Sequence, residues 1–213
     1  MTSIVEPAAD GLIFDTDQRC SLAQLRALKA AGFLGGVRTV TFSEAADPSD
    51  ITASEVQDFM SADLGLMLYQ RVRNPGWRPS GPLGGADGRT AIAKAMAAGY
   101  MPKASLFDDL EGIGASSSET LDYANTKALA LLATYLPGEY IGFDVPLTGG
   151  ELFHELIASC YWRSTSRVPD IPERGYALVQ ISENVLVAGM NVDVSISCAD
   201  KLGGRASWMH NAT

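Results

Sequence analysis

The sequence has few cysteine and histidine residues. Its three cysteines, Cys20, Cys160 and Cys198, lie far apart and form no C-x-x-C pair, so the sequence predicts neither a zinc site nor a full disulfide framework. We expect one histidine, His154, on a helix surface and the other, His210, in a loose tail. A histidine-based catalytic triad therefore has no support, and the sequence points to no metal and no organic cofactor.

Positive charge and long apolar runs are also lacking. The 16 Lys and Arg residues are outnumbered by 25 Asp and Glu residues, which gives a formal net charge of −9. This balance argues against non-specific binding to nucleic acid and to anionic membrane surfaces. No stretch approaches the ~20 apolar residues of a membrane span, and residues 1–10 do not resemble a secretory signal. We therefore expect cytoplasmic synthesis, with holin-type release or association with a virion as routes to an extracellular target.

Short apolar runs alternate with amphipathic segments along most of the chain. Such alternation predicts parallel strands, and eight strands predict a compact α/β fold of the (β/α)8 TIM-like barrel type, with few helices in the last third. We expect one domain over residues 1–213, with a core at about 11–197; an open doubly wound sheet is the alternative. The expected strands are Gly11–Asp15, Val37–Phe42, Leu64–Gln70, Ser105–Glu111, Tyr140–Asp144, Ser159–Trp162, Tyr176–Ile181 and Val192–Ile196.

The connections carry their own signals. Asn74–Gly85 is rich in Pro and Gly and predicts a long surface loop of the kind that often carries function, followed by a helix over Gly88–Ala98. Thr52 with Glu55, and Ser116 with Glu119, have capping-box spacing. The glycines that begin at Gly112 look like a dinucleotide-binding loop, but the third glycine of that fingerprint is missing.

The fourth expected strand ends in three carboxylates. Successive side chains of a strand point to opposite faces, so Asp109 and Glu111 share one face, roughly 6–7 Å apart along it, and Asp108 faces the other way. That separation lies between the carboxylate gaps of retaining and inverting glycosidases. A solvated strand end is the alternative interpretation of the pair. For Asp108 we expect a cation or a helix N-terminus as partner.

Other polar and aromatic residues fall near the ends of the expected strands. Because barrel enzymes carry their chemistry where parallel strands end, these residues should gather at one mouth. Acids there would create a negative potential, and flat aromatic faces beside carboxylates suit a carbohydrate ring. The candidate substrate-binding residues are Asp15, Tyr69, Asp144, Tyr161, Trp162, Gln180 and Asp193.

These residues resemble a known family. Asp15, the Asp-x-Glu of Asp109 and Glu111, Gln180 and Asp193 are similar to positions in the family-25 glycoside hydrolases, the Chalaropsis-type lysozymes. The layout is still more similar to a related glycoside-hydrolase-like domain family of unknown function, found in actinobacterial proteins and phage. The segments Leu28–Phe33 with Val37-Arg38, and Gly88–Ala95, carry that likeness.

The resemblance implies a barrel with its site in the mouth. For the lysozymes it further implies hydrolysis of the β-1,4 bond between N-acetylmuramic acid and N-acetylglucosamine, which makes peptidoglycan the expected polysaccharide partner. The sequence departs from the lysozyme pattern at Tyr69-Gln70-Arg71, where a Tyr-His is usual.

The resulting hypothesis gives each carboxylate a role. Glu111 would act as general acid, with its pKa raised by Asp109 and by partial burial, while an ionised Asp109 would orient the substrate or stabilise the oxocarbenium-like transition state. Asp15 and Asp193 would bind sugar hydroxyls. Two alternatives stay open: a catalytically inactive barrel that binds cell-wall glycan or a protein, for instance as a phage structural or lysis module, and an acid cluster that holds Mg²⁺ or Ca²⁺ for phosphoester chemistry.

Overall fold

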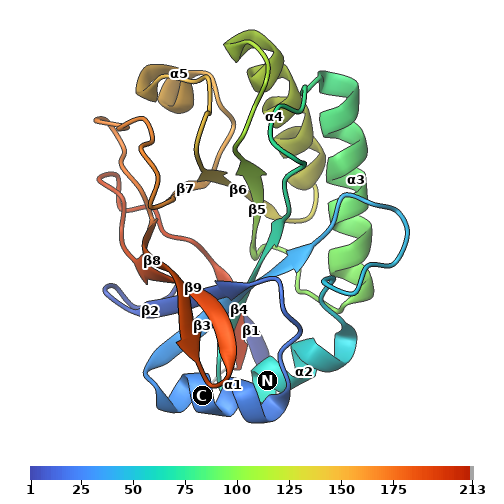
Figure 1. The fold of residues 1–213 in the computed structure, drawn as a ribbon, viewed down its shortest axis with the longest axis vertical. Helices are drawn as coiled ribbons and strands as arrows, with labels where there is room; N and C mark the ends of the chain where they lie inside the picture. Colours follow the sequence, from blue (N-terminus) through green and yellow to red (C-terminus); the bar gives the residue numbers. More distant parts are fainter. Residues whose placement is uncertain (212–213) are drawn as a thin grey trace.

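Eight strands close into a barrel in the computed structural model, which describes residues 1–211. Each strand is hydrogen-bonded to the next, and the last pairs with the first, so the α/β barrel expected from the sequence is confirmed (Figure 1). Its strands are β2 (Leu12–Thr16), β3 (Phe33–Val40), β4 (Gly65–Gln70), β5 (Ser105–Leu110), β6 (Leu136–Ile141), β7 (Cys160–Arg163), β8 (Leu178–Val187) and β9 (Met190–Ser197).

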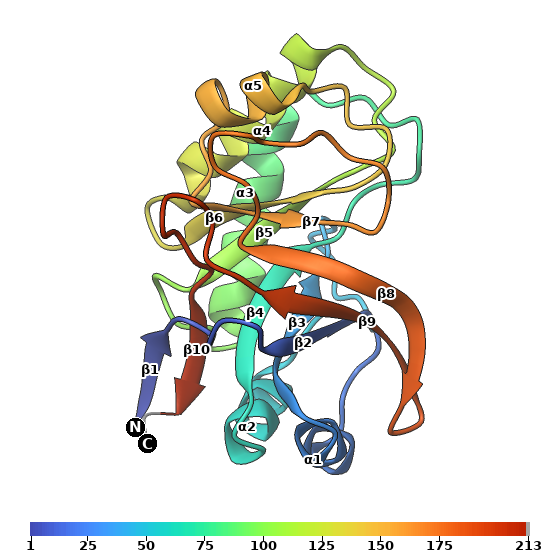
Figure 2. The same ribbon diagram turned by 90° about the vertical axis from the view of Figure 1, so that its left-hand side faces the viewer.

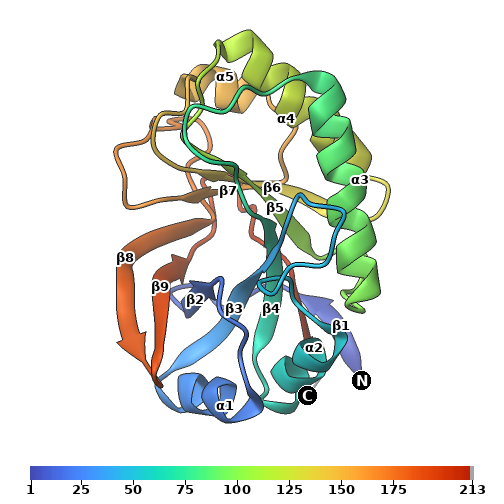
Figure 3. The same ribbon diagram turned by 45° about the vertical axis from the view of Figure 1, so that its right-hand side comes forward.

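Five helices follow the first five of these strands. They are α1 (Leu22–Ala30), α2 (Ala53–Ser61), α3 (Gly81–Ala97), α4 (Ser117–Leu131) and α5 (Gly149–His154). Within residues 1–211 no helix follows β7, as expected for the last third of the chain. Figure 3 shows α3 and α4 along one side of the barrel, whereas no helix covers the β8–β9 hairpin on the other side. None of the helices in the described part of the chain is long and apolar enough to cross a bilayer.

The last strand of the barrel corrects the expectation of eight parallel strands. Strand β9 runs antiparallel to both of its neighbours, β8 and β2. Ala188 and Gly189 form the two-residue turn between β8 and β9, and both have positive φ, at 52° and 73°. Such a turn joins antiparallel strands, because a parallel crossover needs a dozen or more residues.

Two short strands lie outside the expected core. Strand β1 (Thr2–Val5) pairs with β10 (Trp208–Asn211), and β10 pairs with β4, so the two ends of the described chain lie side by side (Figure 2). His210, expected in a loose tail, is part of β10, with its Nε2 atom 3.4 Å from a carboxylate oxygen of Asp63. The indole of Trp208 is 4% exposed and packs with side chains of the barrel interior.

Glycines at the start of α3 correct a second expectation. The segment up to Gly85 was expected to be loop, but the helix begins at Gly81. A Cβ atom on Gly84 would lie 2.1 Å from the carbonyl oxygen of Tyr123, and one on Gly88 would lie 3.0 Å from Ala130. These glycines therefore let the backbones of α3 and α4 approach closely, and the loop after β4 is confined to residues 71–80.

The packing of Trp208 generates a stability prediction. Trp208→Ala should lower the free energy of unfolding by about 3–5 kcal/mol, because it empties part of a packed core. Leu202→Ala, at a side chain that is 65% exposed, should change it by less than about 0.5 kcal/mol. Urea unfolding followed by circular dichroism measures both.

A second pair of variants tests the specific contact. A Cβ atom on Gly65 would lie 2.2 Å from the Trp208 ring. Gly65→Ala should therefore lower the free energy of unfolding of the wild-type protein by about 1–3 kcal/mol. In a Trp208→Ala background the same substitution should lower it by much less. An equal cost in both backgrounds would show that Trp208 does not occupy this space.

Candidate active site

One small cavity collects most of the predicted site residues. It has a volume of about 120 Å³, well below the roughly 300–1,000 Å³ of typical small-molecule pockets. Seven of its eight lining residues were candidates from the sequence, and Tyr140 is the eighth. The lining consists of Asp15, Tyr69, Asp109, Glu111, Tyr140, Trp162, Gln180 and Asp193.

Strand register brings these residues together. Asp109 of β5 lies beside Tyr140 of β6, which lies beside Trp162 of β7. Across the closure of the barrel, Asp15 of β2 lies directly opposite Asp193 of β9. Because β9 is antiparallel, Asp193 reaches the mouth from the first half of its strand, not from its C-terminal end as expected.

Asp15 and Asp193 form an acidic pair. The Oδ2 atom of Asp15 is buried and has no hydrogen-bond partner among the described residues. Burial raises the pKa of Asp15 well above its ordinary value, and the charge of Asp193 raises it further. Asp193 has hydrogen-bond donors for both of its carboxylate oxygens: the side chain of Gln180 (2.9 Å) and the backbone N–H of Asn184 (2.7 Å). Burial still raises the pKa of Asp193.

Asp109 and Glu111 form the second acidic pair. Burial, then the charge of Glu111, raises the pKa of Asp109 well above its ordinary value. The pKa of Glu111, which is only partly buried, is raised by burial and then by the charge of Glu183. We expected Asp109 to stay ionised and Glu111 to hold the proton. Burial instead favours a proton on Asp109 as well, so in the free protein the pair ionises reluctantly.

The hydrogen bonds of Asp109 are incomplete. Its Oδ2 atom accepts one from the backbone N–H of Val72 at 3.3 Å, and its buried Oδ1 atom has no partner within residues 1–211. A buried polar atom without a partner costs free energy. The Asp109 residue lines the cavity, so the unsatisfied acceptor belongs to the site itself.

The loop after β4 holds Glu111 in place. The indole N–H of Trp77 donates to the carbonyl oxygen of Glu111 at 3.0 Å. Backbone hydrogen bonds from Gly76 to Gly112 (2.7 Å) and from Gly114 to Trp77 (2.9 Å) join this loop to the loop after β5. The sequence predicted a long surface loop here but gave no sign of its contact with Glu111.

Two candidates from the sequence lie elsewhere. Tyr161 is buried among the side chains around α5, where its hydroxyl donates to the carbonyl oxygen of Leu152. Tyr161 and Trp162 are adjacent in β7 and point to opposite faces, so only one of them can line the cavity. Asp144 is exposed in a turn beyond the end of β6, with φ at 51°.

Tyr140 is the residue that sequence reasoning missed. Strand β6 ends at Ile141, three residues before the expected end at Asp144. Its inward-facing residue is therefore Tyr140, whose hydroxyl donates to the side-chain oxygen of Gln180 at 3.0 Å. The Gly142 that follows Ile141 was the available signal for an earlier strand end, because glycine is disfavoured inside strands.

Asp108 faces away from the cavity, as predicted. Its carboxylate forms a buried ion pair with Lys127 of α4. The expectation that Asp108 pairs with a cation is thus confirmed. Adjacent residues of one strand therefore differ: Asp108 has a buried counterion, and Asp109 has none.

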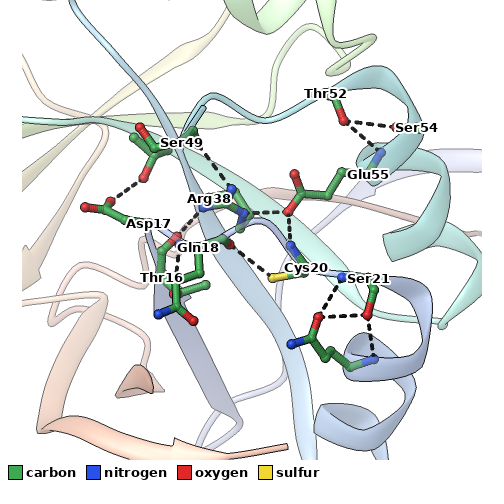
Figure 4. A network of polar contacts seen from close by, with 12 residues as sticks. Thr16, Asp17, Gln18, Cys20, Ser21, Arg38, Ser49, Thr52, Ser54 and Glu55 are labelled. Carbon is green, nitrogen blue, oxygen red and sulfur yellow. Dashed lines mark hydrogen bonds and ion pairs between the residues drawn. The ribbon is translucent and has the colours of Figure 1, made fainter. Parts of the chain in front are cut away.

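A buried arginine supports the strand that carries Asp15. Arg38 on β3 donates to Glu55 of α2 at 2.7 Å, to the carbonyl oxygen of Thr16 and to that of Ser49 at 3.2 Å (Figure 4). Glu55 also accepts from the backbone N–H of Cys20 at 2.9 Å. The expected capping box at Thr52 is therefore incomplete, since the Glu55 carboxylate turns inward instead of back to the helix start.

The acidic side chains of the mouth are not arranged to bind a metal ion. Within residues 1–211, no group of three or more His, Cys, Asp or Glu side chains is arranged to hold a metal ion. The chemistry available to the cavity from its own residues is proton transfer and charge stabilisation by carboxyl groups.

Comparison with known proteins assigns the family. Residues 26–184 match the family described as Rv2525c-like, glycoside hydrolase-like domain. The chain belongs to this family. A search of curated proteins gives no significant match.

Solved structures share the fold of this Rv2525c-like domain. The Tat-secreted protein Rv2525c of Mycobacterium tuberculosis, in complex with L-tartrate, is 17% identical with a TM-score of 0.69, covering 89% of this chain and 96% of that one. A bacterial lysozyme from Streptomyces coelicolor is 14% identical (TM-score 0.62; 90% and 93% covered). A glycosyl hydrolase 25 of Streptococcus pneumoniae is 13% identical (TM-score 0.59; 88% and 87% covered). At these identities the likeness shows the fold alone, a glycoside-hydrolase-like barrel related to the lysozymes.

The contrast between Asp108 and Asp109 generates a prediction for this Rv2525c-like domain. Asp109→Asn should raise the free energy of unfolding at pH 7, by about 1.4 kcal/mol for each unit by which the folded-state pKa exceeds the unfolded one. A raised pKa means that the folded state binds more protons than the unfolded state above about pH 4, so wild-type stability falls as pH rises through that window. The gain from Asp109→Asn should therefore shrink towards pH 4.

The neighbouring residue provides the matched comparison. Asp108→Asn should destabilise by about 3–5 kcal/mol, because it leaves the Lys127 ammonium group buried without a counterion. Chemical unfolding of both variants at pH 4 and pH 7 measures the difference. Destabilisation by Asp109→Asn at pH 7 would contradict the burial of an unpaired carboxyl group in the cavity.

Proposed function

We propose that this domain is a glycoside hydrolase that acts on cell-wall peptidoglycan as a muramidase. The observation that carries the proposal is the pairing of Asp109 and Glu111 in one cavity at the mouth of a barrel, next to a second acidic pair. Both carboxyl groups have raised pKa values, which suits proton transfer near neutral pH. The family and the lysozyme-like fold point to the same chemistry.

Glu111 is the proposed general acid. It is the more exposed of the two carboxyls, so a glycosidic oxygen can reach it, and burial keeps part of its population protonated. In the reaction it gives its proton to the leaving oxygen as the bond from that oxygen to the anomeric carbon breaks. Glu111 then accepts a proton from the water that attacks the anomeric carbon, which returns the acid to its starting state.

Asp109 is the proposed stabilising carboxylate. Burial favours its protonated form in the free protein, but the positive charge that develops on the sugar ring favours its ionised form. The attraction between Asp109 and the ring is therefore strongest in the transition state, which is where an interaction accelerates a reaction. Asp109 can alternatively orient an N-acetyl group of the substrate for attack on the anomeric carbon.

The remaining residues of the cavity are proposed to bind the sugar. Asp15 and Asp193 can accept hydrogen bonds from sugar hydroxyls, and Gln180 fixes the position of Asp193 through its amide. Trp162, at 2% exposed, lines the cavity and packs against Tyr140 with ring centres 4.7 Å apart. Tyr69 forms part of the wall, with its hydroxyl held by Asp17.

The small cavity supports a second candidate, a barrel that binds glycan or a protein without cleaving it. Its volume of about 120 Å³ leaves little room for a polymer, so most of an oligosaccharide would lie outside it. Binding to insoluble peptidoglycan without release of new reducing ends would favour this second function.

The hydrolase is tested by Glu111→Gln. The variant should release reducing ends from purified peptidoglycan at least roughly a hundredfold more slowly than wild type, because a general acid contributes about 10²–10⁴-fold. The wild-type rate should fall as pH rises through the raised pKa of Glu111, since the acid form is then lost.

Glu6→Gln is the matched control. Glu6 lies outside the cavity, its side chain is 59% exposed, and its carboxylate is 3.9 Å from Arg205, so the variant should behave like wild type. Equal rates for wild type and Glu111→Gln, or no reducing ends from either protein, would show that the hydrolase proposal is wrong.

A further inference from the structure

A second cavity lies beside the acidic one. It has a volume of about 470 Å³, and we call it the arginine cavity. It lies between the loops that follow β3 and β4. The lining residues that matter here are Phe42, Asp47, Arg71, Arg73, Asn74 and Trp77.

The loop after β4 contacts residues of both cavities. Val72 lines the arginine cavity, and its backbone N–H donates to Asp109. Trp77 lines it too, and its indole donates to the carbonyl oxygen of Glu111. A glycan with one sugar at Asp109 and Glu111 can therefore place its neighbouring substituents in the arginine cavity.

The two cavities differ in charge. The acidic cavity has four carboxyl groups in its lining, and none of the described residues that line it is Lys or Arg. The arginine cavity has two guanidinium groups and one acid, Asp47, of which one oxygen is held by the backbone N–H and hydroxyl of Ser49. The first cavity therefore offers an anionic substituent no cation to pair with, whereas the second offers the half-exposed guanidinium group of Arg71.

The two arginines are not equivalent. Arg73 is held by both carboxylate oxygens of Asp87 and lies over the Phe42 ring at 4.2 Å, so its guanidinium group is committed to the fold. Arg71 has a side chain that is 51% exposed, and its one partner among the described residues is Asp17, at 3.2 Å. An exposed ion pair of this kind contributes only about 0–1 kcal/mol.

Asp17 does not depend on Arg71. Its other carboxylate oxygen already accepts hydrogen bonds from the hydroxyls of Thr39 (2.7 Å) and Tyr69. Arg71 can therefore turn part of its guanidinium group towards a ligand while Asp17 stays in place. A guanidinium group binds a carboxylate through two parallel hydrogen bonds, a geometry that a neutral sugar cannot match.

We propose that Arg71 binds a carboxylate of the glycan substrate in the arginine cavity, with Asn74 and Trp77 as neighbouring contacts. The carboxylate belongs to an acidic sugar or to a peptide attached to it. This site rests on the proposed function for the identity of the glycan. It explains how a mouth rich in carboxyl groups accepts an anionic polymer.

Binding measurements test this site separately from catalysis. Calorimetry would compare three oligosaccharides of equal length: a neutral N-acetylglucosamine oligomer, an oligomer that alternates N-acetylglucosamine with N-acetylmuramic acid, and the same oligomer with a dipeptide on each lactyl group. Wild type should bind at least one of the two acidic oligomers more tightly than the neutral one. Arg71→Gln should weaken that binding roughly tenfold, the size of a charged hydrogen bond, and leave the neutral oligomer unchanged.

Two further variants control the comparison. Arg71→Lys keeps the charge and should retain more of the acidic-oligomer affinity than Arg71→Gln. Arg78→Gln removes an arginine whose side chain is 69% exposed and pairs with Glu119 outside the cavity, so it should bind all three oligomers as wild type does. The acidic oligomer that loses more affinity in Arg71→Gln identifies the sugar or the peptide as the source of the carboxylate.

The site is absent if wild type binds neither acidic oligomer more tightly than the neutral one. It is also absent if Arg71→Gln weakens all three oligomers alike or none of them. Failure of hydrolysis with retained, Arg71-dependent binding would contradict the hydrolase proposal alone. Hydrolysis that is insensitive to Arg71 would contradict the carboxylate site alone.

Discussion

Burial of the carboxyl groups of Asp15, Asp109, Glu111 and Asp193 in one cavity is the constraint around which the mouth of the barrel is built. Closure of the barrel sets Asp15 opposite Asp193, and β5 with the residue that follows it places Asp109 and Glu111 in the same cavity. Burial disfavours the ionised form of each group, and within each pair the like charge of the neighbouring carboxylate adds to that effect. The mouth therefore holds protons at a pH where surface carboxyl groups have lost theirs.

Three buried acids around the mouth are paired with cations. Asp108 is paired with Lys127, Glu55 with Arg38, and Asp87 with Arg73. These pairs tie β5 to α4, β3 to α2, and the loop after β4 to α3. Ion pairs thus surround a group of acids that has no cation in its own lining within the described chain. Glu139 of β6 is also buried, with one carboxylate oxygen that lacks a partner among the described residues, so the position of the four acids in one cavity, rather than the lack of counterions alone, favours a chemical role.

Sequence reasoning found the barrel and most of its mouth because strand ends and acids recur together along the chain. It failed where the deciding contacts are long-range. The direction of β9 depends on the turn at Ala188 and Gly189, and the glycines of α3 are explained by the backbone of α4. Tyr140 was missed, and Asp144 was placed at a strand end, because β6 stops three residues earlier than its apolar run suggests. The roles of Arg38 and Arg71 depend on their ion pairs with Glu55 and Asp17, which are distant in the sequence.

The most direct measurement of the central claim is a crystal structure of the Glu111→Gln protein with an oligosaccharide of alternating N-acetylglucosamine and N-acetylmuramic acid. The account predicts a glycosidic oxygen about 2.6–3.2 Å from the side chain of residue 111, with the adjoining anomeric carbon beside Asp109. An oligosaccharide bound away from both residues would contradict the account, as would a cavity that stays closed to sugar at saturating ligand.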